Sequence, residues 1–266
     1  MTTSQFADID WAGKRIRLEY QWIGSLDPSQ PLIVFLHEGL GSVAMWKDFP
    51  QQMCEAANCR GLVYSRPGYG KSTPRVSEDI WQPDFMHRQA FELLPALFKT
   101  LGIDTTANPP ILYGHSDGGS IALLYAARYP MNTSATIVAA PHIFVEDISI
   151  NSIEAAKIAY QKTDLRGKLA RYHSDVDSAF WGWNDIWLSP AFRHWNLTQA
   201  IKTITCPLLA IQGLDDEYGT LEQIHSIKRI LPKTTLLEMP NCGHSPHRDQ
   251  PKALIDACVS FIRPQP

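Results

Sequence analysis

Short apolar runs recur along the chain, separated by polar and turn-forming residues, and predict buried strands. These runs cover residues 32–36, 62–65, 111–113, 136–139, 208–212 and 235–239. Between them, apolar residues recur at helical spacing over residues 46–58, 85–101, 118–128, 221–230 and 251–262. Strands that alternate with helices in this way form a parallel sheet, because each crossover helix packs on a face of the sheet.

Residues 15–22 show a different pattern, in which polar and apolar side chains alternate. Such alternation is typical of a strand that buries one face, and we expect an antiparallel strand at the edge of the sheet. The expected fold is therefore α/β, with a mostly parallel sheet of about eight strands and helices on both faces.

The segment 142–204 interrupts this alternation, because it carries helix signals and no evident strand. Ser174-x-x-Asp177, for example, resembles a capping box at the start of a helix. We predict a helical lid over residues 142–204, inserted after the sixth strand, and an α/β core formed by residues 1–141 and 205–266. The segment contains four of the chain's eight tryptophans. These either form the wall of a substrate pocket or pack the lid onto the core.

Composition narrows the function classes. The chain has 266 residues and a net charge of −3 without a basic stripe, which argues against nucleic acid and anionic membranes as partners. No apolar run has the length of a signal peptide or a membrane span. Five cysteines without a Cys-x-x-Cys pair indicate reduced thiols in a cytoplasmic protein.

The sequence Tyr-Gly-His-Ser-Asp-Gly-Gly-Ser at residues 113–120 carries the first candidate for chemistry. It places Ser116 between two glycines in a Gly-x-Ser-x-Gly pattern, directly after one predicted strand and before a predicted helix. A serine on such a tight strand-to-helix turn is exposed as a nucleophile. An alcohol is a weak nucleophile, so it requires a histidine base and an acid that orients the histidine.

Candidates for both partners follow the last two predicted strands, in the chain order serine, acid, histidine. The acid is Asp215, Asp216 or Glu217, and the base is His244 or His247. The two histidines lack further acidic or cysteine partners at ligand spacing, so we expect neither a metal nor a cofactor.

With these motifs the chain resembles the α/β-hydrolase fold enzymes over nearly its whole length. That resemblance implies a Gly-x-x-Asp acid turn, which selects Asp216, and a late Gly-His pair, which selects His244. It also implies an oxyanion hole formed by the backbone amides of Asp117 and Gly39. Glu38 stands where the family often has glycine, and its carboxylate either bonds to local groups or faces the substrate.

The expected activity is hydrolysis of a carboxylic ester, lactone or thioester with an apolar or aromatic group, through an acyl-enzyme. The same family contains dehalogenases and epoxide hydrolases, which have an aspartate where this chain has Ser116. Ser116 therefore argues against both activities. One alternative is a carbon–carbon hydrolase of aromatic ring-cleavage products, although those enzymes commonly have tryptophan after the catalytic histidine, where this chain has Ser245. The others are a ligand receptor that turns over slowly or not at all, and a cofactor-independent oxygenase. The expected partners are a small-molecule substrate and a second copy of the chain. The candidate pocket residues are Glu38, Phe144, Trp183 and Trp187.

Overall fold

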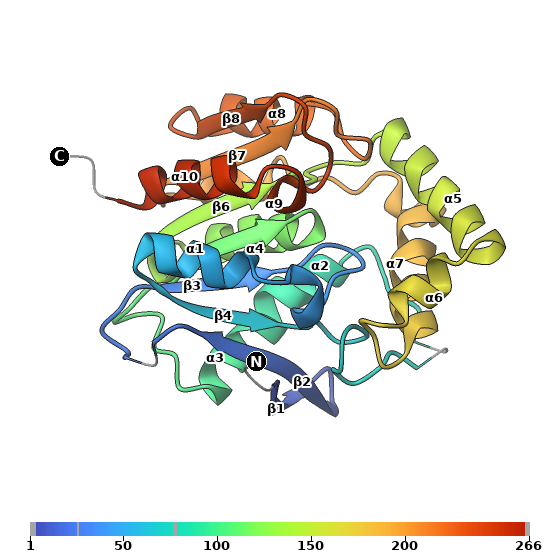
Figure 1. Cartoon of the computed structure of the whole chain (residues 1–266), viewed down its shortest axis with the longest axis horizontal. Helices are drawn as coiled ribbons and strands as arrows, with labels where there is room; N and C mark the ends of the chain where they lie inside the picture. The colour runs from blue at the N-terminus through green and yellow to red at the C-terminus, as the bar shows by residue number, and fades with distance from the viewer. Residues whose placement is uncertain (1–3, 26, 77–78, 264–266) are drawn as a thin grey trace.

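An eight-stranded sheet forms the centre of the computed structural model, which describes residues 4–25, 27–76 and 79–263. The strands are β1 (Gln5–Trp11), β2 (Lys14–Ile23), β3 (Leu32–Leu36), β4 (Arg60–Tyr64), β5 (Ile111–His115), β6 (Ala135–Ala139), β7 (Leu208–Gly213) and β8 (Thr235–Met239). Their order is β1-β2-β4-β3-β5-β6-β7-β8, and β3 to β8 run parallel (Figure 1). The predicted α/β class is confirmed, although residues 1–3, 26, 77–78 and 264–266 of the predicted core lie outside the described residues.

The antiparallel strand predicted for residues 15–22 is present as β2, but its predicted place at the edge is wrong. β2 pairs with β4 on one side and with β1 on the other, so β1 is the edge strand. β1 was missed because its short alternating pattern buries only Ala7 and Ile9.

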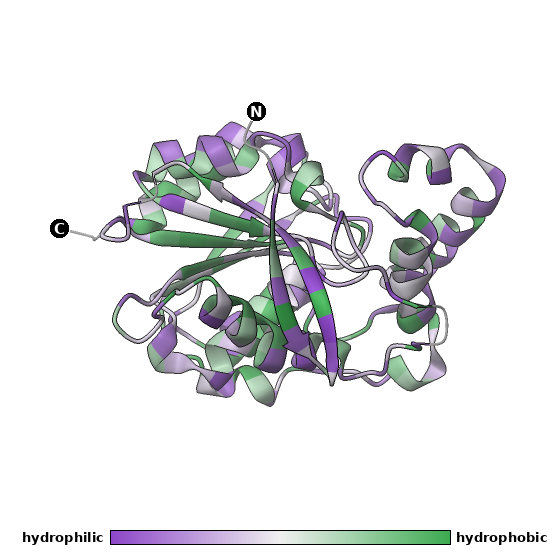
Figure 2. Ribbon diagram, turned by 90° about the horizontal axis from the view of Figure 1, so that it is seen from below, coloured by the Kyte–Doolittle hydropathy of each residue, from purple (hydrophilic) through white to green (hydrophobic). Residues whose placement is uncertain are grey.

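Helices cover both faces of the sheet, as predicted. α1 (Phe49–Ala57) and α10 (Pro251–Ile262) pack on one face, and α2 (Phe85–Arg88), α3 (Leu94–Thr100), α4 (Asp117–Arg128) and α8 (Glu222–Ile230) pack on the other. Residues 33 and 35 of β3 face the first group and residues 34 and 36 face the second. The strand is therefore apolar throughout, because side chains alternate between two buried faces. Figure 2 shows hydrophobic strands at the centre and mixed colouring on the surrounding helices.

The single helix predicted for residues 85–101 is interrupted by five residues of π-helix, Gln89–Leu93, between α2 and α3. Pro95 follows the interruption and has no backbone N–H to donate to the carbonyl of Phe91. That carbonyl instead accepts a hydrogen bond from the hydroxyl of Tyr129, at 3.0 Å. The shorter helical elements are α9 (Pro246–Asp249) and the 3₁₀ turns Val43–Trp46, Pro130–Asn132, Pro190–Phe192 and Ala200–Thr203.

The segment 142–204 forms α5 (Asp147–Lys162), α6 (Leu165–Leu169) and α7 (Val176–Leu188), which stand beside one end of the sheet (Figure 1). The capping residue of α7 is Asp175, whose side chain accepts from Ser178 N at 2.9 Å, so the capping box predicted at Ser174 was one residue too early. Ser149 Oγ and His173 Nε2 bond to backbone carbonyls after β7 and β3. The segment therefore contacts the loops at the carboxyl ends of the strands.

None of the helices in the described ranges is long and apolar enough to cross a membrane. The five cysteines are free thiols.

Candidate active site

Ser116 lies on a strained turn between β5 and α4. Its backbone has φ 52° and ψ −119°, a conformation that a residue with a side chain rarely adopts. The turn requires glycine two residues later, because a Cβ on Gly118 would overlap the carbonyl oxygen of Leu36 at the end of β3. The sheet and the start of α4 therefore meet closely enough to raise the Ser116 hydroxyl above the carboxyl ends of the strands.

The three residues predicted to act together lie in one hydrogen-bonded row. Ser116 Oγ is 3.0 Å from His244 Nε2, and His244 Nδ1 is 2.9 Å from Asp216 Oδ1. Because a carboxylate only accepts hydrogen bonds, Nδ1 of His244 carries the proton and Nε2 is free to accept the proton of Ser116.

The environment of Asp216 keeps its carboxylate charged. Its Oδ1 accepts from Tyr218 N at 2.8 Å and its Oδ2 accepts from Gln212 Nε2 at 2.8 Å. Burial raises the pKa of Asp216, but the hydrogen bond and charge of His244 and the Tyr218 amide outweigh burial, and the pKa lies below its ordinary value.

The competing acids and base occupy other positions. Asp215 is exposed, and Glu217 accepts from the backbone amide of His244 at 3.1 Å. His247 is buried against Trp46, with ring centroids 5.0 Å apart, and burial lowers its pKa to about 3. Glu217 therefore holds the backbone of His244, and His247 is a neutral packing residue.

The two residues predicted to supply oxyanion amides lie on facing segments. Gly39 follows β3 and Asp117 follows Ser116, and Arg66 bridges the two segments by contacting the Glu38 carbonyl and the Asp117 carboxylate. A Cβ on Gly39 would overlap the indole of Trp183, which covers this turn from α7. Only glycine fits under that indole.

The four candidate pocket residues have different surroundings in the structure. Trp183 lies against Gly39, whereas Trp187 is 1% exposed and its Nε1 donates to Asp117 Oδ1 at 3.1 Å. The Glu38 carboxylate lies 3.7 Å from His115 Nδ1 and 3.5 Å from Arg248 Nη2, so it faces local basic groups at ion-pair distance. Phe144 is half-buried, and its backbone forms a bridge with Asn196. Trp183 is thus the pocket candidate that lies at the predicted oxyanion turn.

A family model described as the alpha/beta hydrolase family matches residues 33–257. The chain belongs to the alpha/beta hydrolase family. Among curated relatives of this hydrolase, mouse sn-1-specific diacylglycerol lipase ABHD11 is 24% identical and covers 89% of this chain and 82% of its own. The bifunctional esterase/perhydrolase DCH of Acinetobacter calcoaceticus is also 24% identical, and the match covers 89% of this chain and 93% of DCH. The 2-hydroxy-6-oxo-6-phenylhexa-2,4-dienoate hydrolase of Burkholderia cepacia is 23% identical, and the match covers 98% of this chain and 96% of that enzyme.

Solved structures show the same hydrolase fold. An esterase from Thermogutta terrifontis superposes with a TM-score of 0.71 at 18% identity and covers 98% of both chains. The enol-lactonase of Burkholderia xenovorans LB400 gives a TM-score of 0.72 at 18% identity, over 96% of this chain and 99% of its own. The relatives carry the names of esterases, lipases and other hydrolases, so this protein is a hydrolase enzyme.

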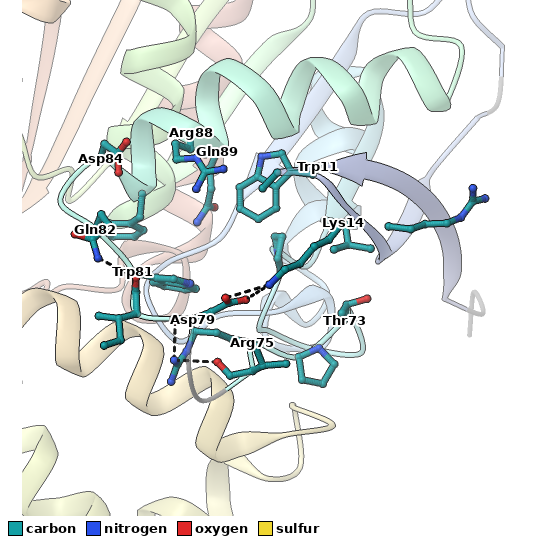
Figure 3. A pocket seen from close by; sticks show the side chains of 18 residues that line it. Trp11, Lys14, Thr73, Arg75, Asp79, Trp81, Gln82, Asp84, Arg88 and Gln89 are labelled. Carbon is teal, nitrogen blue, oxygen red and sulfur yellow. Dashed lines mark hydrogen bonds and ion pairs between the residues drawn. The ribbon is translucent and has the colours of Figure 1, made fainter.

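A cavity of about 600 Å³ in this hydrolase lies away from the row of Ser116, His244 and Asp216. It opens between the β1–β2 turn, the loop before α2 and α2 itself, and Figure 3 shows Trp11, Trp81 and Gln89 on its walls. Lys14 on its wall is paired with Asp79, and Arg75 donates to the backbone carbonyls of Val76 and Asp79. None of Ser116, His244 and Asp216 lines this cavity, so it is not where Ser116 would meet a substrate.

Two histidines that lie beside Ser116, His244 and Asp216 were not predicted from the sequence as site residues. His115 Nε2 donates to the His244 carbonyl at 2.6 Å, and the ring of His142 lies 5.8 Å from that of His244. Burial and the charge of His244 lower the pKa of His142 to about 3, so it is neutral. The position of His142 three residues after the end of β6 was the signal that could have identified it. Among the described residues, no group of three or more histidine, cysteine, aspartate and glutamate side chains is placed to hold a metal ion.

Proposed function

We propose that this hydrolase cleaves a carboxylic ester, lactone or thioester through an acyl-enzyme on Ser116. The observation that carries the proposal is the unbroken hydrogen-bonded row from Ser116 through His244 to Asp216 on a strained turn. A serine gains nucleophilicity when an oriented imidazole takes its proton.

The proposed reaction has two half-reactions. His244 Nε2 takes the proton of Ser116 Oγ as that oxygen attacks the substrate carbonyl, and Asp216 stabilises the resulting imidazolium. The backbone amides of Gly39 and Asp117 stabilise the oxyanion. His244 then donates the proton to the leaving alcohol or thiol. Water, activated by the same histidine, attacks the acyl-enzyme and releases the acid and Ser116.

The proposed substrate carries an apolar or aromatic group. Trp183 lies directly over Gly39, so a group bound beside the scissile carbonyl meets an indole. Pockets lined by aromatic side chains favour apolar ligands. The proposed lid is the segment 142–204, from which Trp183 projects.

The test combines ester hydrolysis with covalent labelling. Purified protein is assayed with p-nitrophenyl acetate, butyrate and benzoate, and is incubated with a fluorophosphonate whose adduct is located by mass spectrometry. We expect turnover and a single adduct on Ser116. Ser116→Ala should remove the adduct and lower kcat/KM by about 10⁴-fold or more. A Ser116→Ala variant that keeps wild-type turnover would refute the proposal.

A carbon–carbon hydrolase is the second candidate, because the relative from Burkholderia cepacia that carries such a name spans nearly the whole chain. The residue after His244 is Ser245, where the resemblance would lead us to expect tryptophan in that class. Assaying a vinylogous 1,5-diketone beside the esters separates the candidates. A kcat/KM for the diketone that exceeds every ester value would favour carbon–carbon cleavage.

A further inference from the structure

The peptide that joins Glu38 to Gly39 is held firmly by its carbonyl oxygen. This oxygen accepts from Arg66 Nη2 at 2.7 Å, from His37 Nδ1 at 2.7 Å and from Gly41 N at 3.1 Å. The peptide is trans and planar, so its N–H points opposite to its C=O. The groups that hold the Glu38 carbonyl therefore also set the direction of the Gly39 amide.

His37 is in the protonation state that this arrangement requires. Its Nε2 accepts from the backbone amide of Arg66 at 3.0 Å, which leaves the ring proton on Nδ1 to donate to Glu38. Burial, followed by the charge of Arg66, lowers the pKa of His37 well below its ordinary value. The ring is neutral, and Arg66 supplies the positive charge at this carbonyl.

The Arg66 guanidinium is fully buried and needs a counter-ion. Its Nη2 and Nη1 lie 3.4 and 3.5 Å from Asp117 Oδ2, and the group lies 4.7 Å from the centre of the Tyr69 ring. Asp117 is the residue after Ser116, and its other carboxylate oxygen accepts from Trp187 of α7 at 3.1 Å. One buried chain of contacts thus joins the Glu38–Gly39 peptide, Arg66, Asp117 and α7.

We propose that Arg66 is a positioning residue that directs the Gly39 amide towards the substrate oxyanion, with Asp117 as its counter-ion and Trp187 as the link to α7. This inference rests on the proposed acyl-enzyme chemistry at Ser116. A guanidinium suits the task because it has several donors in one plane and can bond to a carbonyl and a carboxylate together.

The test removes the pair without leaving an unpaired buried charge. Arg66→Met alone would strand the Asp117 carboxylate, which is strongly destabilising. The double variant Arg66→Met/Asp117→Asn removes both charges and keeps an oxygen that can accept from Trp187. Arg166→Met is the matched control, because Arg166 also forms two contacts to one aspartate, Asp177, but on the surface.

Kinetics and inhibition provide the first readout. With p-nitrophenyl butyrate we expect the double variant to lose about 10- to 100-fold in kcat at nearly unchanged KM, which is less than the cost of deleting an oxyanion donor. The Ki of a trifluoromethyl ketone, which forms a tetrahedral oxyanion on serine, should rise by a similar factor. The control should stay within twofold of wild type in both. Values within twofold of wild type in the double variant would overturn the proposal.

A crystal structure of the double variant provides the second readout, which does not depend on activity. We expect the Glu38–Gly39 peptide to rotate away from its wild-type orientation. An unmoved peptide would overturn the positioning role, even if kcat fell. If wild type itself neither hydrolyses esters nor reacts with fluorophosphonate, the proposed function fails, and the orientation of the peptide still decides the role of Arg66.

Discussion

Ser116 combines backbone strain with a hydroxyl that is hydrogen-bonded to the side chain of His244. Its φ of 52° is costly for a residue with a Cβ, on the order of 1–3 kcal/mol, and it persists because β5 and α4 determine the turn from both sides. The strain is useful if it presents the hydroxyl to a substrate. At the same scale, Asp216 differs from its neighbour Asp215 by burial and by the histidine it contacts.

The pair Asp216 and Asp215 offers a matched comparison. Asp216→Asn should lower kcat by several orders of magnitude, on the order of 10⁴-fold, because an amide that donates to Nδ1 holds His244 in the wrong tautomer. Asp215→Asn should change kcat less than threefold, because that side chain is exposed. Steady-state ester kinetics on both variants measure the difference. The opposite ranking would assign the acid role to Asp215.

At the scale of elements, α7 connects the segment 142–204 to the site through two tryptophans with different surroundings. Trp183 covers Gly39, whereas Trp187 is bonded to Asp117 and packs on Phe192, with ring centroids 5.0 Å apart. The sequence predicted both as pocket residues. Their positions make Trp183 the better probe of substrate choice, since removing Trp187 would also leave a buried carboxylate oxygen without its donor.

Trp183→Ala should change substrate preference more than intrinsic reactivity. We expect the ratio of kcat/KM for p-nitrophenyl benzoate over acetate to shift by about tenfold, because an aromatic wall is lost from the proposed pocket. The labelling rate with a small fluorophosphonate should change less than threefold. Trp181→Ala is the control on the same helix, where Trp181 is half-buried and packs on Tyr160. Equal losses in both measures would show that Trp183 is structural packing.

At the scale of the whole molecule, the two cores on opposite faces of the sheet bury several histidines in neutral form. Burial is the main cause that lowers the pKa of His142 and His247 to about 3, against an ordinary value near 6.5. Between these values the unfolded chain binds more protons than the folded one. Stability should therefore fall as the pH decreases from about 6.5 towards 3.

Urea unfolding at pH 7.5, 6.5, 5.5 and 4.5 measures this dependence. Each buried histidine contributes at most about 1.4 kcal/mol per pH unit to the slope. His247→Gln should reduce the slope below pH 6.5 by roughly the contribution of one proton. A wild-type free energy of unfolding that is constant from pH 7.5 to 4.5 would contradict the neutral, buried state.

The sequence alone determined most of the strands, the main helices and the serine turn, because side-chain periodicity and turn chemistry are local. Residues 32–36 and 251–262 have the predicted bounds in the structure. The chain order of serine, acid and histidine also followed from which residues come directly after strands.

Only the tertiary structure decided which segments distant in the chain meet. It placed β1 outside β2, separated Asp216 from Asp215 by burial, and turned Trp187 towards Asp117. For Asp216 the burial agrees with the choice that the Gly-x-x-Asp spacing implied through the family resemblance. The place of β1 and the partner of Trp187 have no local signature, because both depend on the packing of the whole chain. The contact of Arg66 with the Glu38 carbonyl is of the same kind, since it requires the ends of β3 and β4 to lie side by side in the folded sheet.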